Sequence, residues 1–505
     1  MSLDELRKEI DAADKTILKA IEKRMDVARR IGEEKRLVGR PIYDVAREAD
    51  KLDSLEDSAG AESKPYIREL YDKIFELTRR HEDKKLFGVL GQKLPHTYSP
   101  EIHHMLTDRY TYGIIEREPD ELDELFRCKV YGGFNVTIPY KKEAYIRCDV
   151  LSEEASATGA VNTVVFGPDG KTYGYNTDVY GFTYMLKSAS IEAEGRKCLV
   201  LGHGGAAGAV EYALIKMGAS SVTFCSRRED INYENVYDIC SDAQVIVNCT
   251  PVGMYPEVEG EVIDLSRFPS AEAFADLIYN PSATRLMQKA QALGLKTAGG
   301  LTMLVAQAYK ASLYFRGAEH ADDAREEAQK TRSIVISLEK MMKNITLIGM
   351  PGCGKTTLGK AIARATGKEF IDLDVAFLEK YGIKPSECIA NEGEDAFRSK
   401  ESALAAEILP RSGKVISCGG GIVTRDINRF FVKCNSRVIY LKRPLEVLAG
   451  EDRPITAREG VSNLYEQRRA NYESWCDIVL DIPSCKDKAE LLETSLDRLY
   501  SEDFL

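Results

Sequence analysis

The segment 345–363 constrains the fold more than any other part of the chain. Its sequence, ITLIGMPGCGKTTLGKAIA, reads as a β-strand, a glycine-rich turn and a helix. Backbone N–H groups in such a turn surround the phosphates of a nucleotide, while the lysine neutralises their charge and the threonine hydroxyl holds Mg²⁺. The residues expected at the phosphates are Gly349, Gly352, Cys353, Gly354, Lys355, Thr356 and Thr357, with Thr356 also at the metal. The segment therefore predicts an α/β domain that binds a nucleotide with Mg²⁺.

Composition limits the class of protein and its partners. At 505 residues, with 44% hydrophobic and 30% charged residues, the chain is long enough for about two to four globular domains. The formal net charge of −11 argues against a general nucleic-acid or membrane binder, although a local basic pocket can still hold a small anion. The 12 cysteines lack metal-ligand spacing, and we expect no signal peptide or membrane span, which favours a cytoplasmic protein with reduced thiols.

The secondary-structure pattern divides the chain into unlike blocks. Residues 1–84 carry helical periodicity, and residues 86–317 alternate short β-rich runs with helical segments. A charged helical linker at 318–341 precedes a second α/β pattern at 342–505. We therefore expect a multidomain protein with an all-α helical domain, an α/β region of two subdomains and an α/β P-loop domain.

Cations interrupt the apolar face of the first predicted helix, which runs from Leu3 to about Arg36. Apolar residues recur at helical spacing, but Arg24 and Lys35 fall on the same stripe. At 1.5 Å per residue this helix is roughly 50 Å long, too long for two short helices of the same chain to cover. We therefore expect a homodimer through this block. The two cations either extend to water at the ends of the dimer seam or bind an anion.

The helical block resembles the all-helical chorismate mutases. The run RPIYDVAREADKL is similar to their second-helix signature, and the matching spacing extends to Arg7, Arg24, Lys35, Asp44, Arg47 and Glu48. The resemblance implies that Arg7 of a partner subunit, Arg24 and Arg47 hold the two carboxylates of chorismate. It further implies that Lys35 stabilises the ether oxygen, and that Asp44 and Glu48 bind the hydroxyl or orient the cations.

Two positions of the last helix of this block depart from the family. Thr78 and Glu82 stand where well-studied members carry Ser and Gln. A carboxyl group donates to the ether oxygen only when it is protonated, so acid should favour the rearrangement if Glu82 faces the substrate. A solvated helix end is the alternative for Glu82.

The central block contains a dinucleotide-binding pattern. KCLVLGHGGAAGAVEYAL reads as strand, glycine turn and helix, and the residues expected at a pyrophosphate are Gly202, Gly204, Gly205, Ala206 and Ala207. The next strand ends in Ser226, Arg227 and Arg228, where an NAD-binding protein usually has a carboxylate. This favours a 2′-phosphate and therefore NADP(H), with a pair of solvated loop arginines as the alternative.

Further motifs of this block resemble the shikimate dehydrogenases. HTYSP, GFNVTIPYK, GAVNTV, YNTDVYG, NCTPVGM and GLTMLVAQA occur in the order of that family between Leu86 and about Gly317. The resemblance implies a substrate domain at about 86–194, a Rossmann domain at about 195–300 and a final helix that returns to the substrate domain. It also implies NADPH-dependent reduction of 3-dehydroshikimate to shikimate.

The same resemblance assigns the dehydrogenase site residues. Lys141 and Asp178 are the expected catalytic pair, because the alkoxide formed by hydride transfer needs a proton. The implied contacts of shikimate are Thr97, Ser99, Thr137, Asn162 and Gln307, with Tyr279 as a further contact of substrate or cofactor. Thr97 stands where many members have Ser.

The C-terminal block resembles shikimate kinase from Lys343 to about Tyr500. IDLDVAF, EDAFRSKE, CGGGIV and EDRP occur in the order of that family. The implied site comprises Asp372 near the metal, Asp374, Arg398, Gly419, Gly420 and Gly421 around shikimate, Arg468 at its carboxylate and Arg453 in a lid. P-loop proteins also phosphorylate or hydrolyse nucleotides, but the glycine run and the Asp-x-Asp motif argue against a nucleotide acceptor.

Together the resemblances predict a trifunctional enzyme. It would convert chorismate to prephenate, reduce 3-dehydroshikimate with NADPH and phosphorylate shikimate with MgATP. The alternative is a bifunctional dehydrogenase and kinase whose helical domain is a regulatory or dimerisation module.

Overall fold

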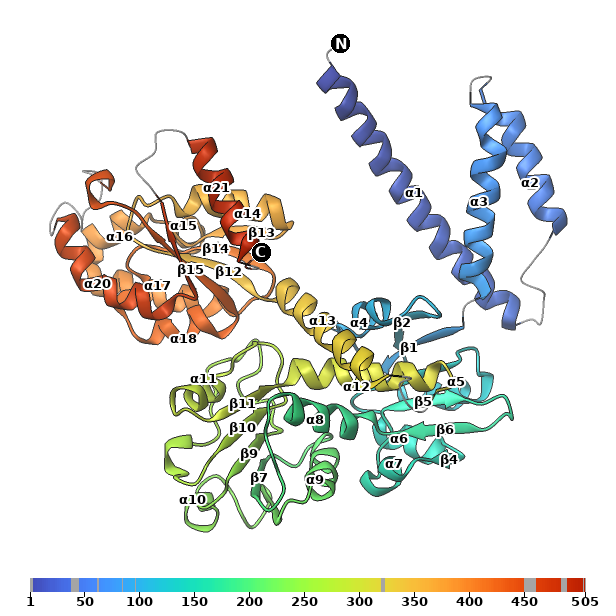
Figure 1. Ribbon diagram of the computed structural model, residues 1–505, viewed down its shortest axis with the longest axis horizontal. Helices are drawn as coiled ribbons and strands as arrows, with labels where there is room; N and C mark the ends of the chain where they lie inside the picture. Colours follow the sequence, from blue (N-terminus) through green and yellow to red (C-terminus); the bar gives the residue numbers. More distant parts are fainter. Residues whose placement is uncertain are drawn as a thin grey trace. The chain divides into compact units, whose positions relative to one another are not determined.

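The computed structural model describes most of the chain (Figure 1). The described residues are 3–37, 45–60, 63–83, 85–95, 97–318, 323–448, 460–482, 488–502 and 504. They form two compact units, which are Met1–Thr177 with Ala308–Asp322, and Asp178–Gln307 with Asp323–Leu505. Among the described helices, none has the length and apolar character needed to cross a membrane.

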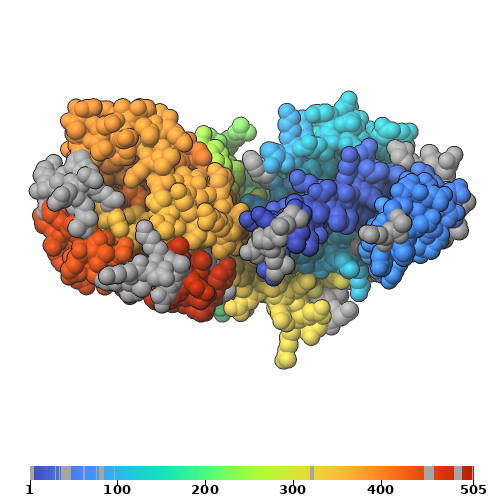
Figure 2. All heavy atoms as spheres, turned by 90° about the horizontal axis from the view of Figure 1, so that it is seen from above, coloured from blue at the N-terminus to red at the C-terminus, as the bar shows by residue number. Residues whose placement is uncertain are grey.

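Three helices form the N-terminal domain. They are α1 (Leu3–Leu37), α2 (Val45–Ser58) and α3 (Lys64–Asp83). α3 packs against both α1 and α2, and the buried side chains include Ala28, Leu52 and Phe75. The N-terminal half of α1 instead leaves large apolar side chains such as Ile10 and Ile17 exposed, at 62% and 55%. Much of α1 lies at the molecular surface (dark blue in Figure 2), so one copy of the chain leaves this apolar face in water.

The first sheet follows the helical domain and has the strand order β2-β1-β3-β5-β6-β4. Its strands are β1 (Leu86–Gly91), β2 (Thr111–Glu116), β3 (Gly133–Val136), β4 (Val150–Leu151), β5 (Thr163–Phe166) and β6 (Thr172–Tyr175). Its helices are α4 (Ser99–Leu106), η1 (Pro119–Glu121), α5 (Leu122–Cys128), α6 (Lys141–Arg147) and α7 (Glu153–Thr158). Successive residues of a strand face opposite sides, so Leu90 packs with Phe134 while Val89 packs with Phe315 near the end of α12 (Gly300–Phe315).

The second sheet has the order β11-β10-β9-β7-β8, and all of its pairings are parallel. Its strands are β7 (Lys197–Leu201), β8 (Ser221–Cys225), β9 (Val245–Asn248), β10 (Ala273–Asp276) and β11 (Lys296–Gly299). The connecting helices are α8 (Thr177–Ser188), α9 (Ala207–Lys216), α10 (Val236–Ile239), η2 (Leu265–Arg267) and α11 (Arg285–Ala292). From β7 the chain first adds β8 on one side and then β9, β10 and β11 on the other side. Dinucleotides bind at the point where the strand order switches in this way.

The third sheet has the order β13-β14-β12-β15-β16 and is also parallel. Its strands are β12 (Asn344–Ile348), β13 (Glu369–Asp372), β14 (Lys414–Ser417), β15 (Ser436–Lys442) and β16 (Ile478–Asp481). The helices are α13 (Ala324–Met342), α14 (Lys355–Thr366), α15 (Leu373–Tyr381), α16 (Pro385–Glu392), α17 (Glu394–Ile408), η3 (Ile422–Thr424), α18 (Ile427–Cys434), η4 (Leu445–Val447), α20 (Val461–Trp475) and α21 (Lys488–Ser501). The glycine-rich turn joins central strand β12 to α14, which is the context that the sequence predicted.

Candidate active sites

The P-loop holds Lys355 in the first turn of α14. Its Nζ donates to the carbonyl oxygens of Gly349 at 2.9 Å and Met350 at 3.0 Å, and the residue is only 8% exposed. Two loop carbonyls therefore fix the ammonium over the turn. The N-terminus of α14 adds unpaired backbone N–H groups and the positive end of its dipole, so the loop suits the phosphates of a nucleotide.

Thr356 and Asp372 form the expected metal position. The Thr356 hydroxyl donates to Asp372 Oδ2 at 2.7 Å, and Asp372 Oδ1 accepts from the backbone N–H of Asp374 at 3.0 Å as the N-cap of α15. A hydroxyl and a carboxylate are hard oxygen donors. Mg²⁺ prefers such donors together with waters and substrate phosphates, so the two residues fit this ion.

A cavity of about 690 Å³ joins the P-loop to the predicted acceptor residues. Its lining includes all of the sequence-predicted acceptor residues that are described, namely Asp374, Arg398, Gly419, Gly420, Gly421 and Arg468. Arg468 is 4% exposed and donates to the carbonyl oxygen of Gly420 at 3.3 Å. Arg453, the predicted lid residue, lies outside the described residues.

Glu401 is a member of this cavity that sequence reasoning missed. Its Oε2 accepts from Arg398 Nη1 at 2.7 Å, and the two side chains are 6% and 8% exposed. Burial raises the pKa of Glu401, while the Arg398 guanidinium opposes that shift. The sequence does contain a signal for this pair, because Glu401 follows Arg398 by three residues in EDAFRSKE, a spacing that brings two side chains together on a helix.

Gly421 is required by the position of Arg398. A Cβ at Gly421 would lie 2.1 Å from the guanidinium nitrogens. Any larger residue would therefore force the Arg398 guanidinium to move from this position. This close approach explains why the glycine run lies beside the acceptor position.

A cavity of about 620 Å³ lies among the three helices of the N-terminal domain. The predicted residues that line it are Arg24, Lys35, Arg47, Glu48 and Thr78. Arg24 donates to the Thr78 hydroxyl and lies over the Phe75 ring at 5.4 Å from its centroid. Three of the predicted cations thus meet at one cavity, which suits a dianion.

Three further residues predicted for the mutase site are not among the described residues that line this cavity. Arg7 is exposed on the N-terminal half of α1 and does not line it. Asp44 lies outside the described residues, and so does the side chain of Glu82, although its backbone belongs to α3. The roles of all three remain predictions.

The dehydrogenase residues of the first unit surround the ends of β3, β5 and α4. Thr97 donates from its hydroxyl to Ser99 Oγ at 3.2 Å, at the start of α4. Asn162 is 3% exposed, and its Oδ1 accepts from the backbone N–H of Thr177 at 2.7 Å. Lys141 is the first residue of α6, four positions after Thr137.

A buried network that sequence reasoning missed supports this region. Tyr112 donates to Asn135 Oδ1 at 2.7 Å, and Asn135 donates onward to the Thr163 hydroxyl at 3.0 Å. His103 stacks on Tyr112 with ring centroids 3.8 Å apart, and burial lowers the pKa of His103 to about 3. The imidazole is therefore neutral near pH 7, which fits its packing among aromatic rings.

The remaining dehydrogenase residues, Asp178, Tyr279 and Gln307, belong to the second unit. Asp178 is 8% exposed near the start of α8. A Cβ at Gly181 in the same helix would lie 2.9 Å from Gln307 Cβ on α12. This close helix contact places Asp178 and Gln307 on neighbouring elements.

The predicted dinucleotide turn follows β7. Gly202 has φ of +90°, and a Cβ there would lie 2.8 Å from Thr250 Cγ2. A Cβ at Gly204 or Gly205 would meet no described atom within 4 Å, so the turn is open beside them. α9 starts at Ala207 with Ala206 as its N-cap, and its first N–H groups therefore follow the turn directly.

The residues beside the predicted 2′-phosphate position include a hydrogen-bonded pair that sequence reasoning missed. Arg227 and Arg228 are exposed after β8, and the Arg228 N–H donates to Ser226 Oγ at 3.4 Å. Glu229 Oε1 lies 2.7 Å from His203 Nδ1. His203 also stacks on Phe224, with ring centroids 4.5 Å apart. The pair connects the glycine turn to the arginine loop.

Asp276 anchors the loop that follows β9. It is fully buried, and its Oδ1 accepts from Asn248 Nδ2 at 3.1 Å while its Oδ2 accepts from the Thr284 hydroxyl at 2.7 Å. Asn248 Oδ1 in turn accepts from the Thr250 hydroxyl at 2.7 Å. Burial raises the pKa of Asp276 to about 6, although these hydrogen bonds oppose the shift.

We expect the Asp276→Asn substitution to remove a pH dependence of local stability. The pKa in an unfolded chain is about 3.9, so the folded state binds the proton more tightly, and stability falls as pH rises from about 4 to about 6. The full effect is on the order of 3 kcal/mol. Hydrogen exchange of β9 and β10 amides, compared between the variant and the unmodified chain at each pH, measures it. Parallel profiles would contradict the assignment.

Comparison with known proteins identifies segments in all three blocks. Residues 6–83 match the family model for chorismate mutase type II, residues 89–164 the shikimate dehydrogenase substrate binding domain, and residues 351–499 shikimate kinase. A shikimate dehydrogenase (NADP(+)) of Clostridium perfringens is 35% identical over 262 residues, 48% of this chain and 96% of the relative. One of Caldanaerobacter subterraneus is 36% identical over 260 residues, 46% of this chain and 92% of the relative.

One similar solved structure is also a fusion of two of these enzymes. It is a chorismate mutase/shikimate 5-dehydrogenase fusion protein from Clostridium acetobutylicum, 32% identical, with a TM-score of 0.48. The similarity covers 51% of this chain and 99% of that one.

The P-loop domain with its cavity, the helical domain with its cationic cavity and the sheet with its open glycine turn define a multidomain enzyme of small-molecule metabolism. The chain belongs to the shikimate dehydrogenase family. It also carries a chorismate mutase domain before the dehydrogenase and a shikimate kinase domain after it. The three family resemblances predicted from the sequence are thus confirmed.

Proposed function

We propose that this chain catalyses three reactions of aromatic biosynthesis. It reduces 3-dehydroshikimate to shikimate with NADPH, phosphorylates shikimate with MgATP and converts chorismate to prephenate. The kinase cavity carries the proposal most directly, because it joins a P-loop to an arginine-rich acceptor pocket. The product of the dehydrogenase is the substrate of the kinase, so two of the reactions are consecutive.

In the kinase, positive charge is placed on both sides of the reacting phosphate. Lys355 stabilises charge on the phosphate oxygens, and Thr356 with Asp372 holds Mg²⁺. Arg468 and Arg398 bind the carboxylate and hydroxyl side of shikimate, and Asp374 accepts a hydrogen bond from the attacking hydroxyl. Catalysis then consists of positioning and charge stabilisation, which is what phosphoryl transfer requires.

In the dehydrogenase, Lys141 and Asp178 carry out the proton transfer that accompanies hydride transfer. NADPH supplies the hydride when it is bound. Lys141 donates a proton to the substrate oxygen that becomes the hydroxyl, and Asp178 is the second member of the proposed catalytic pair. Ser99, Thr137, Asn162 and Gln307 bind the other polar groups of shikimate, and Thr97 supplies the hydroxyl that serine provides in many relatives.

In the mutase, the helical cavity holds the substrate in a compact conformation. Arg24 and Arg47 bind carboxylates, and Lys35 stabilises the negative charge that develops on the ether oxygen. We place Arg7 of a partner subunit at the same cavity, because Arg7 lies on the half of α1 whose apolar face is exposed. Burial of that face in a homodimer would complete the site.

The three-substrate assay of the purified full-length chain tests the proposal. Chorismate, 3-dehydroshikimate with NADPH, and shikimate with MgATP should each be turned over. Loss of the first activity alone would leave a bifunctional enzyme with a regulatory helical domain. Sedimentation at several concentrations tests the homodimer. We also place the protein in the cytoplasm, since every cysteine that the structure describes is a free thiol.

Replacing Arg227 and Arg228 with glutamine should weaken NADPH binding about tenfold or more. Each guanidinium can make charge-assisted hydrogen bonds to a 2′-phosphate, and NADH lacks that group. The KM for NADH and the Kd of NADP⁺, measured by calorimetry, separate this effect from a general loss of binding. Arg196→Gln, in the same domain but paired with Glu272, is the control. Equal weakening of both cofactors would contradict an arginine-bound phosphate.

A further inference from the structure

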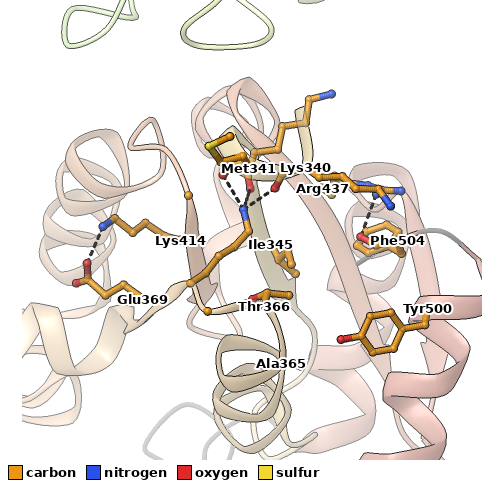
Figure 3. Close-up of a pocket in the computed structure, with 14 residues that line it drawn as sticks. Lys340, Met341, Ile345, Ala365, Thr366, Glu369, Lys414, Arg437, Tyr500 and Phe504 are labelled. Carbon is orange, nitrogen blue, oxygen red and sulfur yellow. Dashed lines mark hydrogen bonds and ion pairs between the residues drawn. The ribbon is translucent and has the colours of Figure 1, made fainter. Parts of the chain in front are cut away.

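A second cavity of the kinase domain lies at the opposite end of its sheet from the P-loop (Figure 3). Its volume is about 620 Å³. It is lined where β12, β13, β14 and β15 begin and where α13, α14 and α21 end. Because the P-loop follows the other end of β12, no residue is shared between this cavity and the kinase active site in the described part of the chain.

Cations dominate the lining of this cavity. They are Lys340, Lys343, Lys368, Lys414 and Arg437, and among the described lining residues only Glu369 contributes a carboxylate. Helix C-termini carry a partial negative charge of about half an elementary charge each, so the ends of α13, α14 and α21 offset only part of this excess. A concentrated positive site in a chain of net charge −11 points to a specific anion.

The lysine side chains of this cavity are more buried than its carboxylate. The side chains of Lys343 and Lys414 are 26% and 25% exposed, whereas that of Glu369 is 66% exposed. Lys414 pairs with Glu369 at 2.6 Å, and Lys343 pairs with Glu339 at 3.4 Å. An ammonium has three N–H donors and each pair uses one. Both lysines can therefore bind an anion and keep their present partners.

Lys368 fixes the geometry of the same wall. Its Nζ donates to the carbonyl oxygens of Lys340 at 2.7 Å, Met341 at 2.9 Å and Lys343 at 2.8 Å, at the end of α13 (Figure 3). Burial lowers the pKa of Lys368 to about 8, and an anion nearby would favour its charged form. The backbone that carries Lys340 and Lys343 is thus held in place before any ligand arrives.

The opposite wall is aromatic. Tyr500 is 51% exposed, and Phe504 is buried beneath the Arg437 guanidinium at 4.2 Å from the ring centroid. Arg437 Nη1 also donates to the carbonyl oxygen of Phe504 at 2.9 Å. A flat ring could pack on Tyr500 with its charged substituents directed toward the cationic side of the cavity.

We propose that this cavity binds a small ring-bearing polyanion, a cyclic or aromatic compound with at least two carboxylate or phosphate groups. The cationic wall recognises the charges, and Tyr500 recognises the ring. The site is additional to the three proposed activities. The elements that form it, β12, β14 and α14, also lead into the kinase active site at their other ends.

Calorimetric titration of the full-length chain with trimesate, a benzene ring with three carboxylates, tests the site. The kinase active site is first filled with shikimate and MgADP. Lys343→Gln combined with Lys414→Gln should weaken trimesate binding about tenfold or more, because each lysine loses a charge-assisted hydrogen bond. Trimesate that binds at any other cationic pocket contributes the same heat in the unmodified chain and in every variant, so this heat cancels when they are compared.

Matched variants keep the test specific. Lys380→Gln combined with Lys433→Gln removes two lysines that pair with carboxylates elsewhere in the domain, and it should leave trimesate affinity unchanged. Tyr500→Ala should weaken trimesate more than citrate, which has three carboxylates and no ring. Unchanged shikimate phosphorylation shows that each variant is folded. Equal affinities in the unmodified and Lys343/Lys414 proteins, or equal loss in both double variants, would overturn the proposal.

Discussion

Shikimate phosphorylation should fall by at least about a thousandfold when Lys355 is replaced with alanine. The ammonium is held over the P-loop by the carbonyl oxygens of Gly349 and Met350, where it would face the phosphates of bound ATP. Without it, the charge that develops on the transferring group loses its nearest fixed cation. Initial rates at saturating shikimate and MgATP measure the loss in kcat.

Lys360→Ala provides the matched control, because Lys360 lies on the same helix and is exposed. It should retain nearly full kinase activity. The dehydrogenase and mutase rates of the Lys355 variant should also stay unchanged, since neither site includes the P-loop. A Lys355→Ala protein that kept a tenth of its kinase activity would contradict the role given to this lysine.

Reduction of 3-dehydroshikimate should fall by about a hundred to ten thousandfold when Lys141 is replaced with alanine. The substrate oxygen must gain a proton as the hydride arrives, and Lys141 is the proposed donor. The loss should appear mainly in kcat, because the other proposed substrate-binding residues, Ser99 and Asn162 among them, are unchanged in the variant. NADPH oxidation, followed by absorbance, measures it.

The neighbouring Lys142 is exposed, so Lys142→Ala tests whether any lysine at the start of α6 has this effect. It should leave the reduction rate nearly unchanged. The Lys141 variant should still phosphorylate shikimate and rearrange chorismate. If a folded Lys141 variant lost all three activities, the independence of the three domains would be wrong.

The sequence by itself determined the three families and the P-loop. Local motifs carry this information, because a strand, a glycine turn and a helix at fixed spacing already specify a phosphate site. The resemblance to the chorismate mutases likewise implied that Arg24, Lys35 and Arg47 act at one site, and the structure brings them together at one cavity. A motif of neighbouring residues or a family signature along one segment can be read directly from the chain.

Only the tertiary structure decided the partners that lie far apart in the chain. Glu401 faces the glycine run at Gly419, Asp276 accepts from Asn248, and His203 contacts Glu229 from the neighbouring strand end. The cationic cavity at Lys343 and Lys414 has the same origin. A parallel sheet gathers the starts of several strands at one edge, so residues many positions apart become neighbours. No local pattern records that convergence, because the crossover helices that produce it are long and variable.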